Sequence, residues 1–127
     1  MIDPVLGLML HSKLHRNYTI EQINRLVMPP VNLNQNLALY EGRCLVAWSS
    51  WAFMDERLAD KFLDSNHKMQ PEDWCSGEFL VVMDYVAPFG HAKKLYRAMR
   101  DLFKDQKQGA WVRHTKGHRR VELTDGR

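Results

Sequence analysis

The spacing of apolar residues at the start of the chain predicts a short helix followed by a polar connection. Asp3 and Pro4 are typical of a helix start, and the apolar residues after them predict a helix that ends near His11. The next segment, "SKLHRNY", holds hydroxyl, imidazole and cationic groups in seven positions. It is therefore the first segment in which we expect chemistry.

A second helix is predicted from Thr19, because Gln22 stands three residues later in the arrangement of a capping box. Its apolar residues are spaced three and four positions apart, as on one buried face of a helix. Proline lacks the backbone N–H that a helix interior needs, so we expect Pro29 and Pro30 to end this helix.

Strand patterns dominate the middle of the chain. Segments 36–41 and 43–51 predict two antiparallel strands with a turn at Glu41-Gly42, and Asp55 is expected to cap a helix after them.

A polar loop over 66–77 leads to the strongest strand signal, the apolar run 79–83, which predicts a strand buried on both faces. Residues 91–105 have helical spacing, and "AWVRH" and "RRVEL" predict two short strands joined by a turn near Lys116-Gly117. These elements together predict an α/β (α+β) fold around a mixed sheet flanked by helices.

Length and composition are those of one globular domain spanning 1–127, with 45% hydrophobic residues. No run of eighteen apolar residues occurs, so we expect no membrane span. The N-terminus lacks the basic start of a secretory signal, which favours a cytoplasmic location. Cys44 and Cys75 are then expected to be reduced thiols.

Charge is distributed unevenly along the chain. Residues 1–90 carry 7 basic and 11 acidic groups, a balance of −4, whereas residues 91–127 carry 11 basic and 4 acidic groups, a balance of +7. The basic last third indicates an acidic partner, for which a protein and a nucleic acid are the two candidates.

Several common functional motifs are missing from the sequence. Without HExxH or CxxC we expect no metal site, and no tightly bound cofactor is indicated. The absence of GxxxxGK[ST], GxGxxG and GxSxG disfavours nucleotide hydrolysis, dinucleotide binding and a serine-hydrolase elbow.

Two residues carry candidate chemistry. Asp84 follows five apolar residues within a strand pattern, where a carboxylate is costly unless it is paired or lies at the open end of the strand. His15, in the polar connection, could act as a general base if another group holds its ring. A structural aspartate that caps the next loop and an ordinary surface histidine are the alternatives.

Four segments in this order resemble a known family: "SKLHRNY", "CLVAWSSWA", "PEDWCSGEFLVVMDYVAPFG" and "LYRAMRDLF". They are similar to the RTX toxin-activating lysine acyltransferases of bacteria, the hemolysin-activating type, over about residues 8–117. The resemblance implies a GNAT-like fold with a mixed, largely antiparallel sheet. It also implies transfer of a fatty acyl group from acyl carrier protein, as co-substrate, to internal lysines of an RTX protoxin.

By the same resemblance, the essential histidine of the family matches His15, its essential aspartate matches Asp84, and a contributing serine matches Ser12. The chemistry suits these residues, because a lysine ammonium with a pKa of about 10.4 must lose a proton before it attacks a thioester. A neutral His15 could accept that proton while Asp84 orients the ring. We favour direct attack over an acyl-enzyme intermediate on Ser12 or His15.

The basic residues Lys93, Lys94, Arg97 and Arg100 fall on one predicted helix and could help to dock the acidic acyl carrier protein; a solvated helix surface is the alternative. Nucleic acid is then not expected as a partner, and a homodimer stays open.

Three departures from the family pattern stand out. Lys13 replaces a frequent proline, Tyr18 stands where tryptophan is common, and the chain ends at Arg127, short of the usual family length. The short end puts dimerisation and protoxin recognition in doubt more than catalysis. Two other functions are therefore carried forward: an acyltransferase for another protein or a small amine, and a non-catalytic binding protein of the same fold.

Overall fold

The fold is built on a four-stranded sheet. The computed structural model describes residues 2–65, 67–106 and 109–111. The strands, in their order across the sheet, are β1 (Asn36–Glu41), β2 (Cys44–Met54), β3 (Phe79–Val86) and β4 (Gly109–Trp111). β2 pairs antiparallel with both β1 and β3, while β4 pairs parallel with β3. The α+β class and the mixed, largely antiparallel sheet are therefore confirmed.

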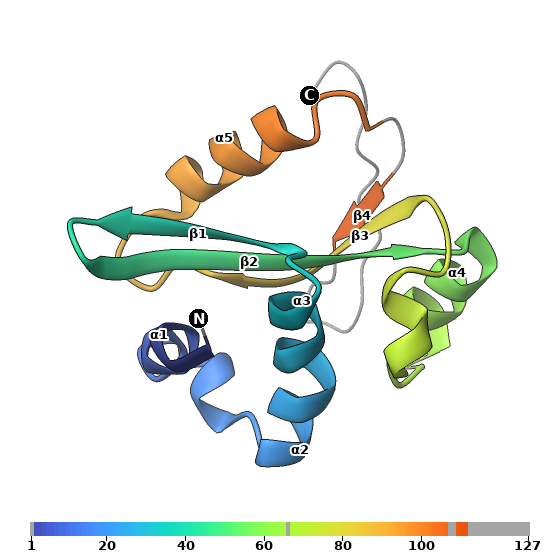
Figure 1. Ribbon diagram of the computed structural model, residues 1–127, viewed down its shortest axis with the longest axis horizontal. Coiled ribbons are helices and arrows are strands. Elements are labelled where there is room, and N and C mark those ends of the chain that lie inside the picture. Colours follow the sequence, from blue (N-terminus) through green and yellow to red (C-terminus); the bar gives the residue numbers. More distant parts are fainter. Residues whose placement is uncertain (1, 66, 107–108, 112–127) are drawn as a thin grey trace.

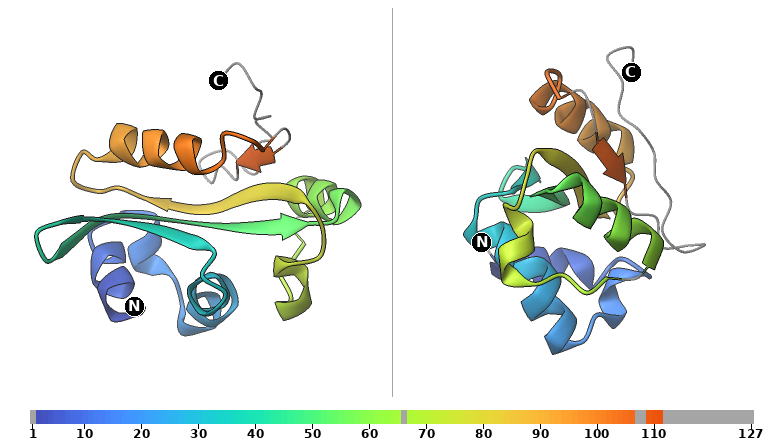
Figure 2. Two further views of the ribbon diagram at one scale, coloured as in Figure 1. Left: turned by 45° about the horizontal axis from the view of Figure 1, so that its top comes forward. Right: turned by 90° about the vertical axis from the view of Figure 1, so that its right-hand side faces the viewer.

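Helices cover both faces of this sheet (Figures 1 and 2). The α-helices are α1 (Ile2–Met9), α2 (Ile20–Gln22), α3 (Met28–Asn32), α4 (Glu56–Ser65) and α5 (Ala92–Leu102). Two 3₁₀ turns, η1 (His15–Asn17) and η3 (Pro71–Trp74), and one π-helical segment, η2 (Ile23–Val27), complete the set. Figure 1 shows α5 on one face and α1 to α3 on the other. None of the helices in the described ranges is long and apolar enough to cross a membrane.

The local signals in the sequence form as expected. Thr19 accepts a hydrogen bond from the N–H of Gln22, whose side chain accepts one from the N–H of Thr19. Asp55 accepts hydrogen bonds from two backbone N–H groups at the start of α4. Gly42, with φ +62°, lies in the turn between β1 and β2 and adopts the left-handed conformation that favours glycine. The hairpin is confirmed, and β2 extends three residues beyond the predicted strand.

The expectation that Pro29 and Pro30 end the second helix is wrong. Both lie within α3, which continues directly from η2. The N–H of Met28 reaches back five residues to the carbonyl of Ile23, so the helical hydrogen-bond pattern restarts at that point. The two prolines then occupy the first positions of a new helical segment, where a missing N–H costs little.

Two other predictions need qualification. The loop over 66–77 contains the short helix η3, which begins with a capping box between Gln70 and Asp73. The strand predicted at "AWVRH" begins as β4, but its continuation, the strand "RRVEL" and the turn at Lys116-Gly117 lie outside the described residues.

Apolar side chains of β2 and β3 pack against the helices on both faces. On the α5 face, Leu80 and Val82 form one cluster with Leu95 and Met99 of α5. On the opposite face, the buried residues of β3 belong to two clusters that also contain residues of α1, η2, α4 and η3. β3 is thus buried on both faces as predicted, and the carboxylate residue Asp84 is buried within this strand.

Candidate active site

His15 and Asp84 are in direct contact although 69 positions separate them in the sequence. The Nε2 atom of His15 lies 3.2 Å from Oδ1 of Asp84, and both side chains are 3% exposed. The contact forms because η1, which begins at His15, packs against β3 near its C-terminal end. The structure therefore brings together the two residues in which the sequence indicated candidate chemistry.

Ser12 extends this contact toward the surface. Its Oγ lies 2.7 Å from Nδ1 of His15, and the same oxygen accepts a hydrogen bond from the backbone N–H of His15 at 3.3 Å. A carboxylate can only accept, so Nε2 of a neutral His15 carries the proton and Nδ1 accepts from the Ser12 hydroxyl. The result is a linear chain from the half-buried Ser12 through the buried His15 to the buried Asp84.

Tyr18 is a fourth member of the site, and sequence reasoning did not assign it a role. Its hydroxyl donates to Oδ1 of Asp84 at 2.6 Å. Burial raises the pKa of Tyr18, and the negative charge of Asp84 and this hydrogen bond raise it further. The phenol therefore stays protonated and keeps donating to the carboxylate. The only available signal was its position three residues after His15, where a short helical turn brings both side chains to one side.

A β-bulge in β3 determines the direction of Asp84. The register passes from Ser49–Tyr85 to Trp51–Val82, so two residues of β3, Met83 and Asp84, oppose the single residue Ser50 of β2. An extra residue of this kind interrupts the alternation of side chains along a strand.

The packing shows this interruption. Leu80 and Val82 face α5, and a regular strand would place Asp84 on that face as well. Instead Met83 packs in the cluster on the opposite face, and Asp84 turns to the same side, where His15 and Tyr18 lie. The carboxylate meets the histidine because β3 carries one residue more than a regular pairing with β2 would need.

The basic residues of α5 do not take part in the Ser12–His15–Asp84 hydrogen-bond chain. Lys93, Lys94, Arg97 and Arg100 are all exposed, whereas Leu95 and Met99 of the same helix are buried against the sheet. α5 covers the other face of the sheet, and its first turn follows the loop after β3. There the loop after β3 places the ring of Phe89 5.1 Å from that of His11, one position before Ser12.

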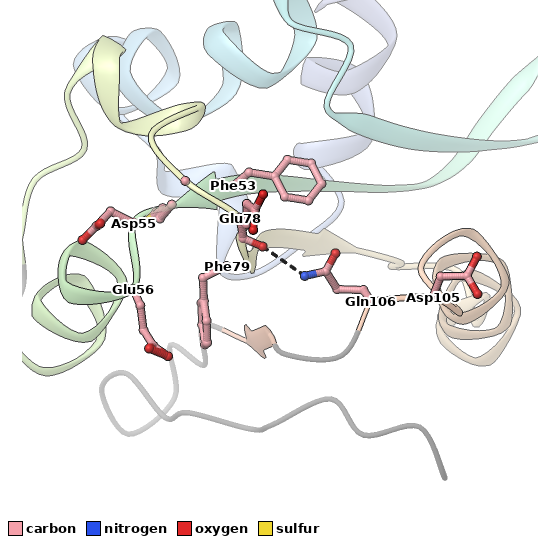
Figure 3. A pocket seen from close by; sticks show the side chains of 9 residues that line it. Phe53, Asp55, Glu56, Glu78, Phe79, Asp105 and Gln106 are labelled. Carbon is pink, nitrogen blue, oxygen red and sulfur yellow. Dashed lines mark hydrogen bonds between the residues drawn. The ribbon is translucent and has the colours of Figure 1, made fainter.

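A separate cavity of about 790 Å³ lies at the other end of β3 (Figure 3). Its lining includes the rings of Phe53 and Phe79 and four carboxylates, those of Asp55, Glu56, Glu78 and Asp105. Phe79 and Asp84 are five strand residues apart, roughly 17 Å. The cavity shares no residue with the Ser12–His15–Asp84 chain.

Comparisons with known proteins show the family of the chain. Residues 1–124 match the model of the RTX toxin acyltransferase family. The chain is 35% identical over 103 residues to the lysine-acyltransferase RtxC of Vibrio cholerae, covering 79% of this chain and 66% of the relative. It is 30% identical over 105 residues to the leukotoxin-activating lysine-acyltransferase LktC serotype A1 of Mannheimia haemolytica, covering 83% of this chain and 63% of the relative.

A third match is to the protein-lysine myristoyltransferase HlyC of Escherichia coli, which is 35% identical over 95 residues. That alignment covers 75% of this chain and 55% of the relative. The three alignments thus cover 66%, 63% and 55% of these relatives, less than two thirds of the length of each.

Proposed function

The chain belongs to the RTX toxin acyltransferase family, and on this basis we propose that it transfers a fatty acyl group from acyl carrier protein to the ε-amine of internal lysines in an RTX protoxin. One observation carries the proposal: the buried Ser12–His15–Asp84 hydrogen-bond chain. A histidine oriented by a carboxylate on one nitrogen, with a hydroxyl on the other, is an arrangement suited to proton transfer during acyl transfer.

In this proposal His15 is the general base. The lysine ammonium of the substrate loses its first proton to solvent on becoming the neutral amine. The amine nitrogen then attacks the thioester carbonyl, and the proton it releases goes to Nδ1 of His15. Asp84 keeps its hydrogen bond to Nε2–H and stabilises the imidazolium that forms. When the carbon–sulfur bond breaks, the departing thiolate takes the proton from Nδ1, which restores neutral His15.

Ser12 mediates this proton transfer. Its hydroxyl already donates a hydrogen bond to Nδ1, and the His15 ring is nearly inaccessible to solvent. The proton of the amine therefore passes to His15 through the Ser12 oxygen. Ser12 passes its own proton to Nδ1 as it accepts one from the amine. The scheme needs no covalent enzyme intermediate, and a serine in this position assists the transfer without being indispensable.

The surface around Ser12 has both apolar and basic character. Leu10, Leu14 and Phe89 are 67%, 45% and 50% exposed, and Lys13 and Arg16 are exposed beside them. Exposed apolar side chains of this size are suited to contact with a hydrocarbon chain. The adjacent cations are suited to an acidic carrier. Together they support an acylated acidic protein as the donor.

The transfer itself can be measured with the purified full chain, myristoyl-acyl carrier protein and a protoxin fragment that contains candidate lysines. We expect mass spectrometry to detect acyl-lysine, and we expect His15→Ala and Asp84→Ala to abolish it. His67→Ala is the matched control, because His67 also contacts an aspartate but does not belong to the Ser12–His15–Asp84 hydrogen-bond chain. Acyl-lysine formed at the wild-type rate by both variants would rule out the proposed roles. An acylated Ser12 peptide in the absence of acceptor would favour the acyl-enzyme route.

The docking role of α5 rests on its exposed cations. The first turn of α5, with Lys93 and Lys94, follows the Phe89 loop that contacts His11 beside Ser12. Arg97 and Arg100 continue the basic surface along the helix. An acidic carrier bound here would lie nearest the site at the start of α5.

Charge reversal tests this docking surface. We expect Lys93→Glu combined with Lys94→Glu to raise the KM for acyl carrier protein by about tenfold at low salt, with little change in kcat. Lys61→Glu, on the exposed face of α4, is the matched control. An unchanged KM at low ionic strength would place the carrier elsewhere.

A further inference from the structure

The backbone of Asp84 is held by two side-chain hydroxyls of the neighbouring strand. The N–H of Asp84 donates to Oγ of Ser50 at 3.2 Å, and Oγ of Ser49 donates to the carbonyl oxygen of Asp84 at 2.8 Å. Both serines are 0% exposed. Both hydrogen bonds lie at the bulge, where β3 has one residue more than β2.

Consecutive residues of a strand point to opposite faces, so the two serines reach Asp84 from opposite sides of the sheet. Ser50 follows the alternation of Trp48, which packs on the α1 side, while Ser49 lies between Ala47 and Trp51, which pack on the α5 side. These two hydrogen bonds restrain the backbone of Asp84 against rotation toward either face of the sheet. The bulge is thereby fixed in the form that turns the Asp84 carboxylate toward His15.

We propose that Ser49 and Ser50 are positioning residues for the acyl transfer: they stabilise the β3 bulge and so keep Asp84 directed at His15. The proposal rests on the proposed function only for its kinetic consequence. Neither serine touches His15 or Ser12 in the described part of the chain, and their effect passes entirely through the backbone of Asp84.

An alanine at either position removes a side-chain hydrogen bond from a buried backbone group of Asp84. The strand can then relax toward regular pairing, which would turn the carboxylate toward α5. Without its acceptor, Nε2 of His15 no longer holds the proton exclusively, and the Nδ1–H tautomer becomes populated because the Ser12 oxygen can accept from it.

The experiment compares Ser50→Ala, Ser49→Ala and Ser76→Ala in the full chain. Ser76 is the matched control, because its hydroxyl also bonds two backbone groups, the N–H of Asp55 and the carbonyl of Asp73, away from the site. Long-range ¹H–¹⁵N spectra of the histidine rings report the tautomer of His15, whose signals are assigned by their loss in His15→Asn. Circular dichroism and thermal unfolding identify the folded variants.

We expect the wild type and Ser76→Ala to show the single Nε2–H tautomer of His15, and Ser50→Ala to show a mixture. With acyl carrier protein as donor, kcat of Ser50→Ala should fall about tenfold while its KM changes less than about twofold. Ser49→Ala should show the same effects and provides the test if Ser50→Ala does not fold. A folded variant with the wild-type tautomer pattern and wild-type kcat would overturn the proposal.

The two readouts separate this inference from the proposed function. If the chain transfers no acyl group but Ser50→Ala still changes the His15 tautomer, the positioning role holds and the proposed function fails. If transfer occurs and neither serine affects the tautomer or kcat, the proposed function holds and the positioning role fails.

Discussion

Within the described residues, the protein contains two histidine–aspartate pairs that share their chemistry but differ in sequence separation and in burial. His67 contacts Asp73 at 2.9 Å, six positions away, and the two side chains are 19% and 10% exposed. His15 contacts Asp84 at 3.2 Å across 69 positions, with both side chains 3% exposed. The first pair is local and partly solvated, while the second depends on the packing of η1 against β3.

The surroundings of the two aspartates show what each pair can do. The oxygen of Asp73 that contacts His67 also accepts the backbone N–H of Gln70, so this carboxylate serves the start of η3. The oxygen of Asp84 that contacts His15 accepts the Tyr18 hydroxyl instead, and the histidine continues to Ser12. In this protein, hydroxyls complete the His15–Asp84 pair, whereas a helix cap completes the His67–Asp73 pair.

The largest expected difference between the pairs lies in the reaction rate. We expect Asp84→Asn to lower kcat by about 10²–10⁴-fold, because His15 loses the charge that stabilises its protonated form. Asp73→Asn should leave kcat near the wild-type value and lower the free energy of unfolding by about 1 kcal/mol, because it weakens a helix cap.

Acyl-transfer kinetics measure the difference in kcat between the two asparagine variants, and urea unfolding measures the difference in their free energy of unfolding. Equal losses of kcat in Asp84→Asn and Asp73→Asn would show that the distinction between the two pairs is mistaken.

Ser12 should have an intermediate effect, since it belongs to the His15 pair alone. Ser12→Ala removes the hydroxyl on Nδ1 but leaves the nitrogen able to accept a proton from the amine directly or through water. We expect kcat to fall about tenfold, well short of the loss in Asp84→Asn. Steady-state kinetics at saturating acyl carrier protein test this order. A loss as complete as that of Asp84→Asn would favour Ser12 as an acyl-accepting nucleophile.

Tyr18 should have the smallest effect on rate and a distinct effect at alkaline pH. Its pKa in the folded state is raised by burial, then by the charge and hydrogen bond of Asp84, so folding favours the protonated phenol. The stabilisation is complete below the unfolded pKa of about 10 and is lost as pH rises above it. Tyr85, whose pKa burial raises to about 12, acts in the same direction.

Removing the Tyr18 hydroxyl should therefore flatten the decline of stability above pH about 10. Denaturant unfolding of Tyr18→Phe at several alkaline pH values measures this change, with Tyr40→Phe, an exposed tyrosine on β1, as control. An unaltered alkaline decline in Tyr18→Phe would contradict the assigned interaction with Asp84.

Much of the local structure could be predicted because its causes lie within a few residues of each other. The capping box of Thr19 and Gln22, the Asp55 cap and the Gly42 turn each depend on neighbours three or fewer positions apart. The run after Glu78 forms the predicted strand because nearly every side chain is apolar. The prediction at Pro29 and Pro30 was wrong because the π-helical segment η2 precedes them, so that they begin a new helical segment and do not interrupt the old one.

The chemically unusual residues can be recognised from the sequence alone: the hydroxyl and imidazole groups of "SKLHRNY", and a carboxylate inside an apolar strand. Their contact depends on the packing of η1 beside β3, which the sequence pattern does not reveal. A strand buried on both faces shows no alternation of polar and apolar residues, so no pattern could reveal the extra residue in β3. That one residue, opposed by Ser50, turns Asp84 from the α5 face to His15.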